Sequence, residues 1–351
     1  MFSLRNNLLL KFAKFKKTNK MKFNSLILVV AVLSTFLFSC KSDEEVIGNW
    51  VSQAFFEGYA RAEGSSFAIN DYGYFGMGKD NDDYLSDFWK FDPTQGTLGA
   101  WTQVADFPGT PRAYNVSINN GTKGYIGLGY DGDNDLSDFW EYDPQTNSWA
   151  EIDSFGGGER RFATAFAINN DIYVGTGTQE KDKIYTSDFW KYDGSQWTKA
   201  PSFAGEKRKK ANAVTLNGKA YIISGTHNGG ALNDFWEFDP STGVWTKLTL
   251  LDDETTGNSS VARYNAAAFA SNGKIYLVGG VQNSSTLTST FEWDPSTQTW
   301  TEKTSLEANG REGFGYFVLS DYGYIVGGHS GSYYFDDCYK FQPDADKVSN
   351  D

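Results

Sequence analysis

Short runs in which apolar and polar residues alternate recur along the chain about every fifty residues. The run SDFWKFDP at 86–93 returns as SDFWEYDP at 137–144, SDFWKYDG at 187–194 and NDFWEFDP at 233–240, with weaker copies at 290–295 and 337–343. In the first copy, Trp89 and Phe91 face one side of a strand and Phe88 faces the other. Aromatic side chains on both faces predict a strand in a sheet that is packed between two neighbouring sheets.

Each repeat also carries a tyrosine: Tyr74, Tyr125, Tyr173, Tyr221, Tyr276 and Tyr324, at spacings of 51, 48, 48, 55 and 48 residues. A strand of small apolar residues precedes it, as in FATAFAI at 162–168, and the tyrosine itself belongs to a second strand such as GYIGLG at 124–129. The DFW run is the third strand, and a fourth begins at a tryptophan. The pattern predicts an all-β fold of six four-stranded units, which is typical of a β-propeller.

The fourth-strand tryptophans are Trp50, Trp101, Trp149, Trp197, Trp245 and Trp300. Trp50 precedes every DFW run, whereas the sixth repeat has no tryptophan of its own. We therefore expect the strand around Trp50 to complete the last sheet. Pairing the two ends of the chain would close the ring and remove an exposed sheet edge.

The glycines after each tyrosine, the tyrosine itself and the later tryptophan resemble kelch repeats over residues 49–343. The resemblance implies a six-bladed β-propeller. The fifth repeat departs from the pattern at Ser289, where the others have aspartate, and the sixth lacks the tryptophan. Galactose oxidase is built on similar repeats, but its copper centre needs histidines, tyrosines and a thioether cysteine. Cys338 lies at the strand position of Phe88 and is expected to pack, so we expect neither copper radical chemistry nor any other cofactor.

The first forty residues differ from the rest. Residues 1–39 carry seven basic residues and no acidic one, and the apolar run at 26–38 is too short to span a bilayer. These features predict a secretory signal peptide over 1–39, with Met21 as an alternative start. The end of this segment resembles the lipobox of bacterial lipoproteins, which implies a lipid on Cys40.

The residues after Cys40 resemble the export signal of Bacteroidota-type surface lipoproteins, in a linker over 40–48 that could also be a plain solvated linker. This resemblance implies an outer-membrane protein that is exposed at the cell surface and touches the membrane only through its lipid. A tail over 344–351 follows the propeller.

The net charge limits the kinds of binding partner, and the cysteine content limits the possible disulfides. Losing residues 1–39 removes seven positive charges from a net charge of −13 and leaves −20. Such an acidic surface repels nucleic acid and anionic membranes. After Cys40, Cys338 is the only cysteine, so no intrachain disulfide framework is expected.

An arginine lies thirteen residues before each repeat tyrosine: Arg61, Arg112, Arg160, Arg208, Arg263 and Arg311. Because this position opens the innermost strand, the six are expected to ring one mouth of the central channel and bind an anionic ligand. The alternative is that each arginine pairs with an acid of a neighbouring blade and locks the ring. The acids considered for that role are Glu63, Glu159, Glu206 and Glu312.

Two histidines and one acidic run lie in the same loops. His227 and His329 each follow a second-strand glycine and are expected at the ligand-facing mouth, too far apart for a shared metal. Asp131, Asp133 and Asp135 have the alternate spacing of a calcium loop, although an ordinary acidic turn explains them as well and no metal is expected.

These features predict a non-catalytic binding module whose partner is a glycan, an acidic small molecule or an envelope protein. The alternative is a sugar mutarotase, because the repeats and blade count are similar to those of the bacterial N-acetylneuraminate mutarotases. Ring opening needs an acid or base near the ring oxygen, and Glu159, Glu206 and Glu312 are the residues considered for it. A purely structural scaffold is a third possibility, and the oligomeric state is not predicted.

Overall fold

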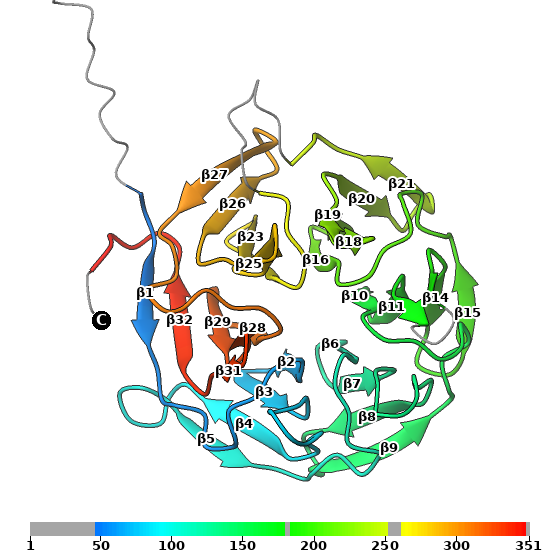
Figure 1. Cartoon of the computed structure of the whole chain (residues 1–351), viewed down its shortest axis with the longest axis horizontal. Helices are drawn as coiled ribbons and strands as arrows, with labels where there is room; N and C mark the ends of the chain where they lie inside the picture. The colour runs from blue at the N-terminus through cyan, green and yellow to red at the C-terminus, as the bar shows by residue number, and fades with distance from the viewer. Residues whose placement is uncertain (1–45, 180–182, 252–260, 349–351) are drawn as a thin grey trace, which may run out of the picture. The chain divides into compact units, whose positions relative to one another are not determined.

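The computed structural model describes residues 46–179, 183–251 and 261–348, all within one compact unit, Val46–Asp351. In these ranges the chain forms strands β1 to β32 and no helix. None of the described residues therefore forms a helix that is long and apolar enough to cross a membrane. Six four-stranded antiparallel sheets surround a central channel, as Figure 1 shows. The prediction of an all-β, six-bladed propeller is confirmed.

Each blade begins at the channel and adds strands outward. Blade 1 consists of β2 (Ser65–Ile69), β3 (Tyr72–Gly76), β4 (Phe88–Asp92) and β5 (Ala100–Gln103). Blade 2 consists of β6 (Val116–Asn119), β7 (Gly124–Gly127), β8 (Phe139–Asp143) and β9 (Ser148–Ile152). Blade 3 consists of β10 (Thr164–Ile168), β11 (Asp171–Gly175), β14 (Phe189–Tyr192) and β15 (Trp197–Ala200).

Blade 4 consists of β16 (Asn212–Leu216), β17 (Lys219–Ile223), β20 (Phe235–Asp239) and β21 (Val244–Lys247). Blade 5 consists of β22 (Ala267–Ser271), β23 (Lys274–Val278), β26 (Thr290–Asp294) and β27 (Thr299–Lys303). Blade 6 consists of β28 (Gly315–Leu319), β29 (Tyr322–Val326), β32 (Cys338–Gln342) and β1 (Asn49–Ser52). The loop after the second strand of blades 3 to 6 forms a small hairpin: β12 (Thr178–Gln179) with β13 (Ile184–Tyr185), β18 (Thr226–His227) with β19 (Gly230–Ala231), β24 (Val281–Gln282) with β25 (Ser285–Thr286), and β30 (His329–Ser330) with β31 (Tyr333–Tyr334).

The core lies between adjacent blades, on both faces of each sheet. On β4, the ring of Phe88 lies 5.2 Å from that of Trp149 in blade 2. The ring of Phe91, on the opposite face, lies 5.7 Å from that of Tyr324 in blade 6. The recurring aromatic run therefore packs a blade against both of its neighbours, as its alternation predicted.

Strand β1 closes the ring. It pairs antiparallel with β32, with Trp50 opposite Phe341, and Figure 1 shows the blue β1 beside the red β32. Trp50 is 1% exposed, its ring lies 4.7 Å from that of Phe341, and its indole N–H donates to the carbonyl of Thr304 at 3.0 Å. The prediction that the strand around Trp50 completes the last sheet is confirmed.

Cys338 occupies the place that the sequence predicted. It is buried in β32 opposite Val326, just as Phe88 is opposite Gly76 in blade 1. Burial raises the pKa of its thiol, so this cysteine packs and stays protonated. Cys40, the signal segment and the start of the linker lie outside the described residues.

Candidate functional site

A ring of hydrogen bonds encircles one mouth of the channel. It is formed by the residue two positions after each repeat arginine: Glu63, Tyr114, Phe162, Lys210, Asn265 and Gly313. The backbone N–H of each donates to the carbonyl of the equivalent residue in the preceding blade, at 2.6–3.4 Å, and Gly313 completes the circuit with Glu63. All six have a positive φ of 54–63°. For a non-glycine residue this conformation is strained, and such strain is common at functional sites.

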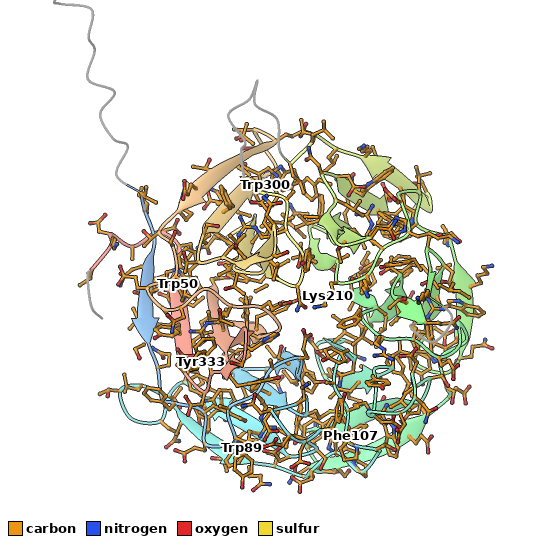
Figure 2. The ribbon with its side chains drawn as sticks, viewed as in Figure 1. Trp50, Trp89, Phe107, Lys210, Trp300 and Tyr333 are labelled. Atoms are coloured by element: carbon orange, nitrogen blue, oxygen red, sulfur yellow. The ribbon has the colours of Figure 1, made fainter. Side chains whose placement is uncertain are left out.

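Side chains of this ring line a pocket at the mouth with a volume of about 130 Å³. Lys210 belongs to this lining, and Figure 2 shows it beside the centre of the ring of blades. The Lys210 ammonium is 3.0 Å from a carboxylate oxygen of Glu312 and 3.6 Å from one of Glu63. The amide N–H groups of Asn265 donate to the same two carboxylates, each at 2.7 Å. We call Glu63, Lys210, Asn265, Glu312 and His329 the mouth cluster.

The mouth cluster fixes the charge states of its members. Burial alone would lower the pKa of Lys210, but the charges of Glu63 and Glu312 outweigh it and raise that pKa. Burial alone would raise the pKa of Glu312, but Lys210 and the hydrogen bond from Asn265 outweigh it and lower that pKa. The cluster therefore holds a carboxylate and an ammonium side by side at neutral pH.

His329 joins the cluster from β30. Its Nε2 lies 3.9 Å from a carboxylate oxygen of Glu312, and its ring stacks on Tyr334 with centroids 5.5 Å apart. In the described part of the chain, Glu63, Glu312 and His329 are the one group whose ligand atoms, all within 4.8 Å of one another, could hold a metal ion. The Lys210 ammonium already lies against both carboxylates, so a metal would have to compete with it.

The six repeat arginines are not at the mouth surface. They are 0–1% exposed, and five of them form a forked ion pair with the aspartate that opens the DFW run of their own blade. The pairs are Arg61–Asp87, Arg112–Asp138, Arg160–Asp188, Arg208–Asp234 and Arg311–Asp337. In blade 5, where Ser289 replaces the aspartate, Arg263 donates instead to the carbonyls of Ser289 and Gly279, each at 3.1 Å.

Each guanidinium also lies over an aromatic ring, at 4.2–5.0 Å from the centroid of Phe56, Phe107, Phe155, Phe203, Phe291 or Phe335. Burial alone would raise the pKa of Asp87, but the hydrogen bonds and charge of Arg61 outweigh it and lower that pKa. The expected position of the arginines around the open mouth is therefore wrong. They fasten the third strand of a blade to the loop that enters it, and the acid they use lies in the same blade.

The other glutamates and histidines considered from the sequence are dispersed. Glu159 is exposed, and Glu206 is half-exposed and pairs with His227. The ring of His227 lies 4.7 Å from that of Tyr185. Each histidine thus contacts its own glutamate, and of the three acids considered for ring opening only Glu312 belongs to the mouth cluster.

The aspartates with calcium-loop spacing do not form a cation site. A side-chain oxygen of Asp131 accepts the backbone N–H groups of Asp133 at 2.8 Å and Asn134 at 2.7 Å. Asp135 is 8% exposed and pairs with Arg161, while Asp133 is exposed. Asp131 and Asp135 thus have separate partners, and among the described residues the three aspartates are not a group that could hold a metal ion, so the loop is an acidic turn.

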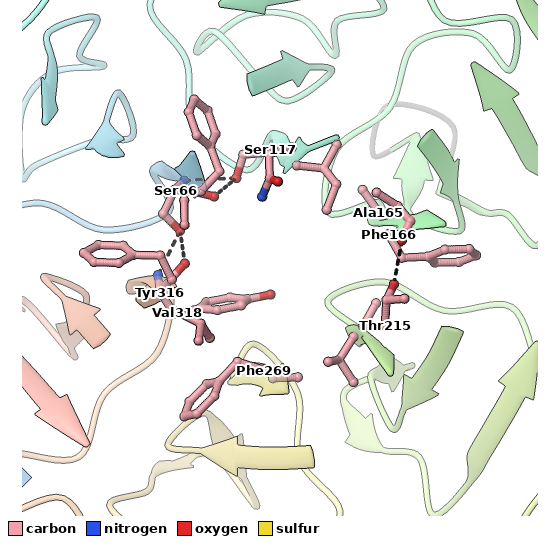
Figure 3. Close-up of a pocket in the computed structure, with 17 residues that line it drawn as sticks. Ser66, Ser117, Ala165, Phe166, Thr215, Phe269, Tyr316 and Val318 are labelled. Carbon is pink, nitrogen blue, oxygen red and sulfur yellow. Dashed lines mark hydrogen bonds between the residues drawn. The ribbon is translucent and has the colours of Figure 1, made fainter. Parts of the chain in front are cut away.

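A second cavity continues inward from the mouth. Its volume is about 420 Å³, and Figure 3 shows its lining side chains arranged around an open centre. Most of the lining is small, but Tyr316 projects into it and its pKa is raised to about 12 by burial. Ser66, Ser117 and Tyr316 line both the mouth pocket and this cavity, so the two are continuous. An extended ligand could therefore reach from the mouth cluster into the channel.

Sequence reasoning missed Lys210, Asn265 and Tyr316, and treated Glu63 only as a partner for arginine. The signal was present two positions after each repeat arginine. That position holds a different residue in every blade, whereas the arginine itself never changes. A variable position inside a constant motif serves something other than the repeat.

Comparisons with known proteins agree with this architecture. A family model described as the KLHDC2/KLHL20/DRC7 Kelch-repeats domain matches residues 164–350, and a Kelch motif matches residues 129–156. The solved structure described as "Structure of YjhT" is similar at a TM-score of 0.70 and 20% identity, covering 83% of this chain and 99% of that one. At that identity the likeness shows the fold alone. No curated protein matches the chain significantly in sequence.

Proposed function

The chain belongs to the KLHDC2/KLHL20/DRC7 Kelch-repeats domain family, and from that premise we propose that it is a binding module whose ligand, a glycan, enters the mouth of the channel. The observation that carries the proposal is the mouth cluster. Its polar side chains come from blades 1, 4, 5 and 6, occupy positions that do not repeat, and converge on a pocket continuous with a larger cavity. A concave site with a few convergent polar groups is typical of small-ligand binding.

The groups at the mouth suit a sugar. Carboxylates accept hydrogen bonds from hydroxyl groups, and the ammonium of Lys210 donates to them. Tyr114 and Phe162, whose rings lie 4.5 Å apart, offer flat apolar surfaces beside these polar groups. The buried arginines have their guanidinium groups inside the blades, so within the mouth cluster two carboxylates face the one ammonium of Lys210. This balance favours a glycan over an acidic ligand.

We expect a titration of residues 46–351 with simple sugars, followed by proton NMR, to show binding. Replacing Glu312 with Gln keeps the shape of the side chain but removes the charge that faces Lys210. The affinity should fall about tenfold or more, because a hydrogen bond to a charged group is lost. Glu302→Gln, on the exposed face of β27, is the matched control and should bind normally. Absence of binding by every sugar, or equal affinity in the two variants, would contradict the proposal.

A second function is favoured by one observation, the contact between Glu312 and Lys210. A carboxylate and an ammonium 3.0 Å apart could act as base and acid in opening a sugar ring. The lowered pKa of Glu312 and the raised pKa of Lys210 make each a weaker base or acid than an unpaired group, so the ligand would have to separate the pair first. The same titration tests a mutarotase activity. Exchange between anomers that is accelerated by the protein and lost in Glu312→Gln would make the protein an enzyme.

We also propose that the propeller is tethered to the outer face of a bacterial outer membrane by a lipid on Cys40. The support is the sequence alone: a basic and then apolar segment that ends at a cysteine, followed by acidic residues. Long acyl chains hold a protein at a bilayer by burying their methylene groups.

We expect Cys40→Ser in the full-length chain to move the protein from the membrane fraction to the soluble fraction and to abolish incorporation of labelled palmitate. Ser42→Ala, two residues further on, is the control and should remain in the membrane fraction. A Cys40→Ser protein that stays membrane-bound and labelled would show that no lipid is attached there.

A further inference from the structure

The mouth cluster holds two carboxylates and one lysine. Glu63 and Glu312 are two carboxylates with side chains only 8% and 17% exposed, and Lys210 is one ammonium between them. Half-buried carboxylates are costly unless each is paired with a positive group or well hydrogen-bonded. Lys210 lies closer to Glu312, at 3.0 Å, than to Glu63, at 3.6 Å. Glu63 is therefore the less closely compensated of the two carboxylates, with the amide of Asn265 at 2.7 Å as a closer donor than Lys210.

Tyrosines surround this side of the mouth. Tyr114 lines the mouth pocket together with Glu63. Burial and then the negative charge of Glu63 raise the pKa of both Tyr114 and Tyr334, so these phenols stay protonated at neutral pH. The ring of Tyr84 lies 6.0 Å from that of Tyr130. The faces of aromatic rings attract cations, most strongly where water is partly excluded.

The chain's own cations already use aromatic rings at this mouth. The Arg161 guanidinium lies 3.5 Å from the centroid of Tyr130. The ammonium groups of Lys210 and Lys209 lie 4.9 Å and 5.3 Å from the centroid of Phe162. Within residues 46–179, 183–251 and 261–348, in contrast, no cation of the chain lies over the rings of Tyr84 or Tyr114. The ring of Tyr114, which lines the same pocket as Glu63, is therefore a cation receptor that no cation of the described residues fills.

We infer that the mouth selects a sugar that carries an ammonium group, with this group against Glu63 and the ring of Tyr114. The inference rests on the proposed glycan-binding function and names the class of glycan. The ammonium would compensate the charge of Glu63, and the sugar ring would extend over Lys210 and Glu312 toward the channel. An acidic sugar would place its carboxylate against two others, which is unfavourable. A metal ion would have to displace Lys210.

The test is isothermal titration of residues 46–351 with glucose and with three sugars that each differ from it in one group: glucosamine, N-acetylglucosamine and glucuronate. Glucosamine carries an ammonium at carbon 2 in place of the hydroxyl of glucose, N-acetylglucosamine keeps this nitrogen without the charge, and glucuronate carries a carboxylate at carbon 6. Glucosamine should bind about tenfold or more tightly than the other three, because it adds a charge-assisted hydrogen bond. Glu63→Gln should remove this preference, and Glu302→Gln should keep it.

The outcomes separate the two proposals. If neutral or acidic sugars bind as tightly as glucosamine, the mouth has no preference for an ammonium group. The inference of an ammonium-bearing sugar is then wrong, and the proposal of glycan binding stands. If none of the four sugars binds, the proposed glycan function falls and takes this inference with it. If ethylammonium binds as tightly as glucosamine, the site recognises an amine and not a sugar, which overturns the inference. Calcium or zinc binding that is tighter than glucosamine and lost in Glu63→Gln would assign the site to a metal instead.

Discussion

A chain that begins at residue 56, and so lacks β1, is expected to lose cooperative folding. Four residue pairs join β1 to β32, and their removal exposes the edge of β32 and uncovers Phe341. Loss of a buried tryptophan alone costs about 3–5 kcal/mol. Because a protein of this kind has a total stability of about 5–15 kcal/mol, loss of the whole strand should remove most of it. Denaturant unfolding, followed by tryptophan fluorescence, measures the effect.

A circular permutant provides the control. It begins at residue 56 and carries residues 48–55 after residue 347, so that β1 follows β32 directly. The ends are close enough for this join, because the backbone N–H of Val348 donates to the side chain of Asn49 at 2.8 Å. The permutant should regain the stability of the natural order. If the truncated chain unfolds at the same denaturant concentration as the full unit, closure by β1 contributes nothing and the prediction is wrong.

The fold could be predicted from the sequence because the pattern of one blade recurs six times. The positions of Phe88 and Phe91, which pack against the two neighbouring blades, are aromatic in most repeats. The closure was visible for the same reason: a tryptophan missing from the sixth repeat and present in excess before the first, at Trp50, leaves one arrangement that completes every blade.

The misplaced arginines show where this reasoning fails. Their positive charge in an acidic chain suggested an anionic ligand, yet the partner was inside the recurring run itself. Asp87 lies 26 residues after Arg61, and the aspartates of blades 2, 4 and 6 have the same separation from their arginines. Two charged residues that recur at a fixed separation serve the repeat, because a ligand bound on the axis has no reason to contact six equivalent groups.

The mouth cluster could not be predicted, because no single repeat contains it. Asn265 and Glu63 are 202 residues apart and meet only because the ring closes. The left-handed backbone at these positions brings side chains of five blades to one mouth, the sixth position being Gly313, and their chemistry is then free to differ. The sequence predicts the blades and the ring positions of such a site. Which side chains meet there depends on which blades face each other across the axis.

Breaking one of the buried ion pairs should be the second large effect. Arg208 in blade 4 is fully buried, and its guanidinium donates to both oxygens of Asp234, at 2.5 Å and 2.6 Å. The indole N–H of Trp236 donates to the same carboxylate at 2.8 Å. Asp234→Ala leaves the buried cation without its counter-charge, and we expect the free energy of unfolding to fall by about 3–5 kcal/mol in denaturant titrations. Asp153→Ala, an exposed aspartate of blade 2, is the control and should change little.

The double variant Arg208→Met, Asp234→Ala separates charge burial from packing. If the loss in Asp234→Ala arises from an uncompensated cation, removing the guanidinium should recover part of it, and the double variant should be more stable than the sum of the two single losses implies. Additive losses would mean that the two side chains contribute independently through packing. The ion pair would then not be the element that fixes the entering loop to the blade, and the near-identical pairs of the other blades would need the same reinterpretation.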